Sequence, residues 1–178
     1  MIRVSMSLEN FLRIACQVLL IRRQGFLLHV AGIVDGTRCF LMFGASGSGK
    51  SLAMQLSAPR PALSDDLVAV DVASGTPQAH AVPSYGSFPP QDRASGSFEV
   101  AAALRLRRSA ENRVEPLGAA RAVATLSASV PFLAELGLDP SALTDVLDRF
   151  RRRVPVAELH FAQDPAFWEV LHARFGQA

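Results

Sequence analysis

The first part of the chain carries apolar residues at helical spacing. Six apolar residues follow the three- and four-residue spacing that places side chains on one face of a helix: Leu8, Phe11, Leu12, Ala15, Val18 and Leu19. Ser7 is placed to cap the start of this helix, and Gly25 to end it. Arg22 and Arg23 suit the last turn, because cations are favoured at a helix C-terminus. The pattern therefore predicts an N-terminal helix within residues 1–25.

A nearly continuous apolar run follows this helix. Residues 26–34 are expected to form a strand, Asp35-Gly36 is a strong hairpin turn signal, and residues 38–43 are the expected return strand. The return strand leads directly into a glycine-rich segment. Residues 50–56 are expected to open a helix there, which nearby prolines stop early.

Strands and helices continue to alternate along the rest of the chain. Strands are expected at residues 67–72, 98–106 and 154–161, and helices at residues 118–126, at residues 141–152 and from Asp164-Pro165 onward. Residues 74–96 are rich in Pro, Gly and Ser and are expected to be loops around short extended pieces. The pattern predicts an α/β or α+β fold in a single domain.

Composition narrows the class of protein. At 178 residues, with 49% hydrophobic and 19% charged residues, the chain suits one compact domain with a buried core. The formal net charge of +2 is small, so nucleic acid is not an expected partner. Arg105, Arg107, Arg108 and residues 151–153 form arginine clusters. Such clusters are usually solvated edges or helix ends, although they remain candidate contacts for an acidic partner.

The cysteines and the N-terminus bear on the location of the protein. Cys16 and Cys39 lie in apolar surroundings and lack the spacing of metal ligands, as expected for buried thiols in a reducing compartment. The apolar stretch at residues 14–21 is too short to span a bilayer, and polar residues interrupt the pattern of a signal peptide. The expected location is cytoplasmic, with no membrane partner.

The glycine-rich segment contains the only lysine of the chain, Lys50. Its octapeptide fits the phosphate-binding P-loop pattern: Gly44, Ala45, Ser46, Gly47, Ser48, Gly49, Lys50 and Ser51. In a P-loop the backbone N–H groups converge on one phosphate, and a compact ammonium reaches the β- and γ-phosphates. Lys50 is therefore expected to bind ATP phosphates, and the Ser51 hydroxyl to ligate Mg²⁺. The alternative is a glycine-rich turn without a ligand.

Asp65 and Asp66 stand at the entrance of the next expected strand. Adjacent side chains on extended backbone point opposite ways, so one carboxylate is free to face a metal while the other faces an acceptor hydroxyl. The alternative is a turn or a helix cap. His29 interrupts the apolar run, and its alternatives are a structural histidine or a participant in catalysis.

Three segments, in this order, carry a resemblance to a known family. They are His29-Val-Ala-Gly-Ile-Val-Asp-Gly, the P-loop octapeptide, and Leu-Ser-Asp65-Asp66-Leu-Val-Ala-Val. Together they resemble the catalytic domain of HPr kinase/phosphorylase and its relatives. The resemblance covers about residues 7–72, is fainter at Tyr85-Gly86 and residues 111–115, and returns near residues 153–159 and 164–168.

The resemblance implies a fold and a set of roles. The fold would be a single-domain P-loop fold of the HPr kinase / phosphoenolpyruvate carboxykinase type, over residues 1–178. Asp65 would be the acid/base beside the acceptor serine, Asp66 a metal-side carboxylate, and His29 a neighbour of the transferred phosphate. The acceptor would be a serine on a protein or peptide, and a homo-oligomer is a possible state.

The chain also departs from true HPr kinases. Leu52 stands where a glutamate usually follows the P-loop serine, and the arginine- and glycine-rich C-terminal signature of phosphorolysis is not found. These departures favour relatives with substrates other than HPr. The leading prediction is an ATP- and Mg²⁺-dependent serine kinase, with a nucleotide-binding core at residues 26–72 and the remaining sheet and C-terminal helices at residues 73–178. The alternatives are a non-catalytic ATP- or ADP-binding regulatory module and a small-molecule kinase.

Overall fold

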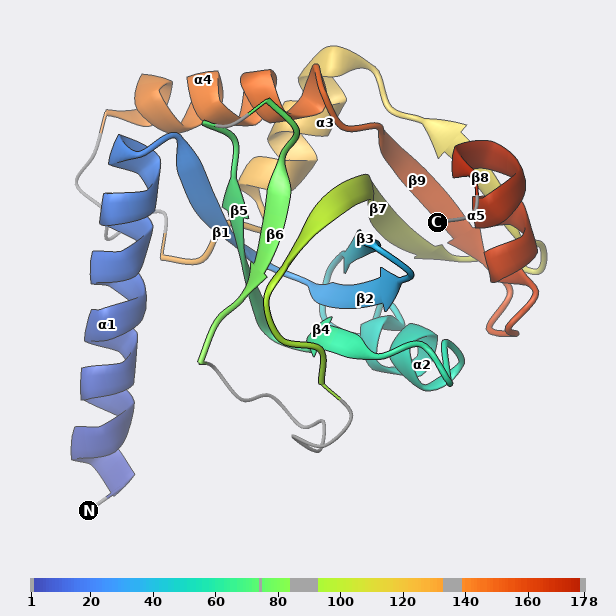
Figure 1. The fold of residues 1–178 in the computed structure, drawn as a ribbon, viewed down its shortest axis with the longest axis horizontal. Coiled ribbons are helices and arrows are strands. Elements are labelled where there is room, and N and C mark those ends of the chain that lie inside the picture. The colour runs from blue at the N-terminus through green and yellow to red at the C-terminus, as the bar shows by residue number, and fades with distance from the viewer. Residues whose placement is uncertain (1, 74, 84–92, 133–138, 177–178) are drawn as a thin grey trace.

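A computed structural model describes residues 2–73, 75–83, 93–132 and 139–176, and it shows a mixed β-sheet with helices on both faces (Figure 1). The helices are α1 (Ile2–Arg22), α2 (Lys50–Gln55), α3 (Ala119–Ser127), α4 (Pro140–Arg151) and α5 (Phe167–Phe175). The strands are β1 (Gly25–His29), β2 (Ala31–Asp35), β3 (Arg38–Phe43), β4 (Ala62–Ser64), β5 (Leu67–Asp71), β6 (Gln78–Ala81), β7 (Ser97–Arg108), β8 (Arg113–Pro116) and β9 (Val156–Phe161). The expected α/β class is therefore confirmed.

The sheet is built around the long strand β7. Strands pair in the order β1-β5-β6-β7-β3-β2-β4, while β9 pairs with the second half of β7 and β8 pairs with β9. Only the β3–β7 and β7–β9 pairs are parallel among the described strands; the others are antiparallel. The C-terminal ends of β3, β7 and β9 consequently lie at the same edge of the sheet, which is where α/β sheets bind ligands.

Two apolar clusters fill the spaces between the sheet and its helices. One contains Leu126 of α3 and Phe150 of α4 with inward residues of the sheet, such as Phe26, whose ring stacks edge-on against Phe150 at a centroid distance of 5.3 Å. The other lies on the opposite face, under α2 and α5, and includes Trp168. These clusters fix the sheet edge from which the glycine-rich loop emerges.

The hairpin and the glycine-rich junction follow the sequence predictions. β2 and β3 pair antiparallel around Gly36, which has the positive φ of 60° that a tight hairpin turn requires. β3 then runs into the loop, and α2 begins at Lys50. The strand, loop and helix expected from the pattern are thus confirmed.

The expected strand at residues 26–34 is wrong in one respect, because the chain divides it into β1 and β2. The break falls at Val30, whose N–H donates to the Asp66 carbonyl at 3.0 Å, while the His29 N–H donates to the Ser129 carbonyl at 2.8 Å. β1 pairs with β5, whereas β2 pairs with β3 and β4. Both pieces are buried on two faces, so the apolar pattern carries no mark of the break.

The predicted ends of two helices also need correction. α1 begins at Ile2, so Ser7 lies within the helix and does not cap it. After the C-terminal end of α1, the residue with left-handed backbone is Gln24 (φ 62°) and not Gly25. α5 begins at Phe167, so Pro165 precedes the helix instead of opening it. Asp164 stabilises the turn that precedes this helix, because its carboxylate accepts a hydrogen bond from the Ala166 N–H at 2.9 Å.

Most of the apolar stripe expected on α1 is exposed to solvent, although its member Val18 packs against the core. The large apolar side chains that are exposed in the described part of the chain are Leu8, Phe11, Leu12 and Leu19, all on α1. The face toward the sheet carries Gln17, a buried amide whose Oε1 accepts a hydrogen bond from the Leu27 N–H at 2.6 Å. None of the described helices is both long and apolar enough to cross a membrane.

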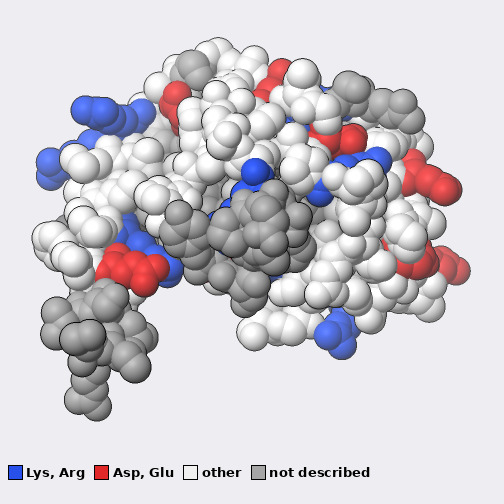
Figure 2. All heavy atoms as spheres, turned by 60° about the horizontal axis from the view of Figure 1, so that its bottom comes forward, with Lys and Arg blue, Asp and Glu red and all other residues white. Residues whose placement is uncertain are grey.

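The charged surface is mixed in sign. On the face shown in Figure 2, acidic and basic side chains are interspersed among uncharged atoms. Arg151 and Arg152 form ion pairs with Asp148 near the end of α4; Arg152 is solvated as expected, whereas Arg151 is largely covered. Three short strands, β4, β6 and β8, were not separately predicted, and Tyr85-Gly86 lies outside the described residues.

Candidate functional site

The glycine-rich loop between β3 and α2 has the backbone of a tight phosphate-type cradle. Gly47 and Gly49 have positive φ angles of 76° and 104°, which side-chain-bearing residues rarely adopt. A Cβ added at Gly44 would lie 2.8 Å from the Ser48 Oγ, and one added at Gly49 would lie 3.4 Å from the Phe161 ring. The loop therefore needs glycines at these positions for conformation and for space.

Two polar side chains of the loop differ in their access to a ligand. Lys50 curls back over the loop, with its Nζ 2.9 Å from the Gly44 carbonyl oxygen and 3.5 Å from that of Ala45. Burial lowers the pKa of Lys50, because a desolvated ammonium is less stable. The Ser48 hydroxyl is buried and has no hydrogen-bond partner within the described part of the chain. An anion above the loop would supply an acceptor to Lys50, whereas Ser48 is not among the residues that line the space there.

A cavity of about 760 Å³ opens above the loop. Its other walls are His29 at the end of β1, two arginines from the end of β7, and the chain from Thr125 to Pro131 at the end of α3. Every charged lining residue among those described is cationic: Lys50, Arg105 and Arg108. The volume lies within the usual range for small-molecule sites, and the charge suits a polyphosphate.

His29 is held by Asp66 at the edge of this cavity. The His29 Nδ1 lies 3.3 Å from the Asp66 Oδ1, and the Asp66 Oδ2 accepts a hydrogen bond from Arg13 at 2.8 Å. The His29 side chain is half exposed, whereas Asp66 is largely covered. The carboxylate thus orients one ring nitrogen of the histidine and leaves the other available to the cavity.

Asp65 is paired with Arg93 and is not among the residues that line the cavity. Its Oδ1 accepts a hydrogen bond from the Arg93 guanidinium at 2.7 Å, and the two side chains are only 8% and 11% exposed. Asp65 and Asp66 form a bend between β4 and β5 instead of an extended segment, and the Ser64 Oγ accepts hydrogen bonds from the Asp66 and Leu67 N–H groups there. The structure brings His29, Lys50 and Ser51 to one cavity and leaves Asp65 and Asp66 outside its lining. The role of Asp65 as acid/base stays a prediction.

The residues present fit the predicted magnesium ion only in part. Ser51 is the first-turn hydroxyl of α2 and lines the cavity, so it is placed to hold Mg²⁺ beside a bound phosphate. Asp66 is engaged with Arg13 and His29 instead. Its role as a metal-side carboxylate therefore stays a prediction.

Sequence reasoning named Arg105 and Arg108 only as members of an arginine cluster and did not place them beside the glycine-rich loop. Arg105 lies directly beside Phe43 in the parallel β3–β7 register, so it stands at the start of the glycine-rich loop. Only the strand order reveals this neighbour, because the two residues are far apart in the chain. The rule that ligands bind at the C-terminal ends of parallel strands is the signal that points to Arg105 and Arg108.

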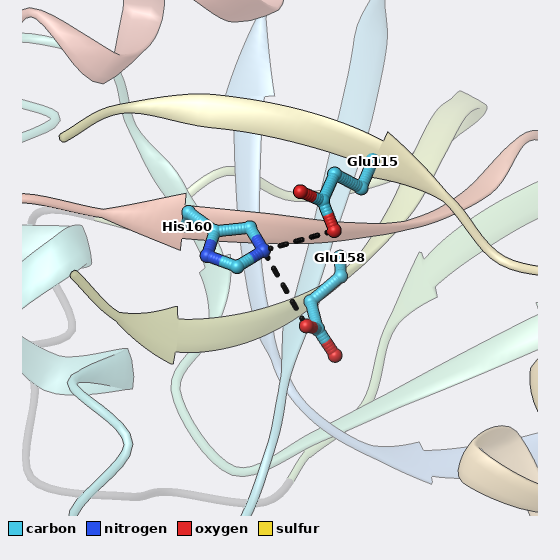
Figure 3. Close-up of side chains that lie close together, drawn as sticks. All are labelled: Glu115, Glu158 and His160. Carbon is cyan, nitrogen blue, oxygen red and sulfur yellow. Dashed lines mark ion pairs between the residues drawn. The ribbon is translucent and has the colours of Figure 1, made fainter.

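One group of metal-type side chains lies nearby on β8 and β9: Glu115, Glu158 and His160 (Figure 3). The His160 Nε2 is 3.2 Å from the Glu115 Oε2 and 3.5 Å from the Glu158 Oε1. Arginines already bind both carboxylates, since Arg113 contacts Glu115 at 2.9 Å and further guanidiniums contact Glu158. The group is therefore an ion-pair network whose cations would repel a metal ion.

A distant structural likeness comes from the comparison with solved structures, whereas the other comparisons find nothing. No known protein family matches the chain, and no curated protein matches it. The fold is similar to that of the Hpr(Ser) kinase/phosphatase from Coxiella burnetii, with a TM-score of 0.49 and 13% identity, over 83% of this chain and 88% of that chain. A likeness this distant transfers neither an activity nor site residues, which rest on the cavity geometry alone.

Proposed function

We propose that this protein transfers the γ-phosphate of ATP to a serine of a protein or peptide. The observation that carries the proposal is the cavity above the glycine-rich loop, whose charged walls are Lys50, Arg105 and Arg108 and whose rim carries His29. A polyphosphate with its negative charge fits these walls, and a histidine beside it supplies a proton acceptor.

The phosphates would be held mainly by the loop. The backbone N–H groups of residues 47–51 would provide donors, and Lys50 would add a positive charge. Mg²⁺ would supply further charge neutralisation on the phosphates, with Ser51 as the residue on the cavity to hold it. Positioning and charge neutralisation supply most of the acceleration in such reactions.

His29 would accept the proton of the acceptor serine. The Asp66 carboxylate faces Nδ1, so Nε2 is the ring nitrogen available to the serine hydroxyl. As the serine oxygen forms its bond to the γ-phosphorus, its proton passes to Nε2. The bond between the γ-phosphorus and the bridging oxygen breaks, and its electron pair leaves with ADP. Asp66 and Arg13 act by positioning the histidine.

The proposal is tested with labelled ATP and a serine peptide library. The wild-type chain should transfer label to serine peptides, and Lys50→Ala should lose both nucleotide binding and transfer. His29→Gln should bind ATP normally and lose transfer, because it lies at the rim of the cavity and not in the loop. Label found only in small molecules would refute a peptide acceptor.

A second candidate is a nucleotide-binding module without transfer. The observation that favours it is the buried pairing of Asp65 with Arg93, outside the lining of the cavity. ATP binding by the wild-type chain with neither transfer nor hydrolysis would select this candidate over the kinase.

A further inference from the structure

A buried carboxylate beside the cavity gathers three arginines. Glu158 on β9 lies 3.3 Å from Arg105, 3.2 Å from Arg107 and 3.1 Å from Arg121. One negative charge therefore faces three positive charges, and two positive charges remain in surplus. We call Arg105, Arg107 and Arg121 the arginine cluster.

The guanidiniums of the cluster are accessible while their anchor is not. The Glu158 side chain is 4% exposed, whereas those of Arg105, Arg107 and Arg121 are 40%, 61% and 56% exposed. Each guanidinium carries five N–H donors, and its contact with Glu158 engages one nitrogen. The buried carboxylate thus fixes the arginines and leaves most of their donors to a ligand.

The cluster continues the cavity. Arg105 belongs to both, because it lines the cavity and contacts Glu158. Arg107 follows it on the same face of β7, and Arg121 stands opposite on α3, whose far end also lines the cavity. A chain that places a serine in the cavity can therefore continue across the cluster.

We propose that the acceptor is an acidic peptide segment, whose Asp or Glu side chains beside the serine bind the arginine cluster. This inference rests on the proposed function. Guanidiniums pair with carboxylates through two parallel hydrogen bonds, which gives such a site geometric selectivity. Arg107 and Arg121 do not line the nucleotide cavity, so the phosphates of ATP leave them to the acceptor.

Two peptide pools provide the test. Both carry a fixed central serine with degenerate flanks, drawn from Asp and Glu in one pool and from Asn and Gln in the other. The variants are Arg107→Gln and Arg121→Gln, and the matched control is Arg152→Gln, an exposed arginine of the α4 end that pairs with Asp148. ATP affinity, kcat and KM are measured for each protein with each pool.

The wild-type chain should prefer the acidic pool by about tenfold or more in kcat/KM. A partly exposed ion pair gives about 1 kcal/mol, so each cluster variant should raise KM for the acidic pool about fivefold. The value of kcat, the ATP affinity and the neutral pool should stay unchanged, and Arg152→Gln should behave as wild type. Arg107→Glu brings the summed charge of the cluster and Glu158 to zero, so the preference for the acidic pool should be lost.

The outcomes separate the two proposals. Equal use of the acidic and neutral pools, or an acidic preference that survives both cluster variants, would overturn the inference and leave the kinase intact. Transfer to no pool would overturn the proposed function. In that case, peptide binding at the arginine cluster is measured by fluorescence anisotropy of the labelled acidic pool in the presence of a non-hydrolysable ATP analogue. Salt-sensitive binding that Arg107→Gln weakens would support the inference that the cluster binds acidic peptides. Binding that this variant leaves unchanged would overturn that inference.

Discussion

Replacing Asp65 by asparagine separates a structural role from a chemical one. The substitution keeps the shape of the side chain and removes the charge that faces Arg93 at 2.7 Å. Opposite charges about 4 Å apart attract by about 4 kcal/mol at an effective dielectric constant of about 20. Asparagine still accepts a hydrogen bond and is less costly to bury, so the free energy of unfolding should fall by about 2 kcal/mol.

Urea unfolding of the wild type and of Asp65→Asn measures this loss. With a slope of about 2 kcal/mol per molar urea, the midpoint should fall by about 1 M. The ATP affinity should stay within about twofold, because Asp65 does not line the cavity. A twofold change corresponds to only about 0.4 kcal/mol of binding free energy. Asp145→Asn, at an exposed position of α4, is the matched control and should leave the midpoint unchanged.

Two results would refute this reasoning. An unchanged midpoint would show that the buried pair does not stabilise the fold. A stable Asp65→Asn variant that binds ATP and transfers phosphate a hundredfold more slowly would place Asp65 at the reacting atoms, against the assignment of proton acceptance to His29.

Other perturbations test other parts of the site and fold. His29→Gln should lower transfer by about 10²-fold or more with ATP affinity unchanged, and a variant as active as wild type contradicts its role. Gly49→Ala should weaken ATP binding and cost about 1–2 kcal/mol of unfolding free energy, because its φ is 104°; calorimetry and urea unfolding measure both. Burial raises the pKa of Asp35, but hydrogen bonds from Arg60 and His172 outweigh it and the pKa is lowered. Its folded-state pKa lies below the unfolded one, so the stability it contributes is present above the unfolded pKa and lost as pH falls through the folded pKa. Asp35→Asn should be destabilised at pH 7 but not in acid, and an equal loss at both pH values would contradict this.

Local signals predicted the centre of the site. The hairpin at Asp35-Gly36 and the junction into residues 44–51 depend on neighbours in the chain, and both appear as expected. Local signals could not place Arg105 beside the loop, because that position depends on the pairing of β7 with β3. The same holds for the end of α3, which is brought to the cavity by tertiary packing.

Periodicity also left the orientation of α1 open. The spacing showed an apolar stripe that includes Phe11 and Leu12, yet these side chains are exposed. The sheet side carries Gln17 because the amide satisfies the Leu27 backbone N–H, a need that a pattern of apolar residues does not record. Likewise, the break at Val30 is set by backbone hydrogen bonds to Asp66 and, from its neighbour His29, to Ser129.

The central claim is that the cavity above the glycine-rich loop binds the phosphates of ATP through Lys50. Isothermal calorimetry of ATP with the wild-type chain and with Lys50→Ala, both checked for an unchanged circular dichroism spectrum, tests it most directly. The account predicts one ATP per wild-type chain and at least about tenfold weaker binding in the variant, equal to 1.4 kcal/mol. Equal ATP affinity in the two proteins, or no binding by the wild type, would contradict it.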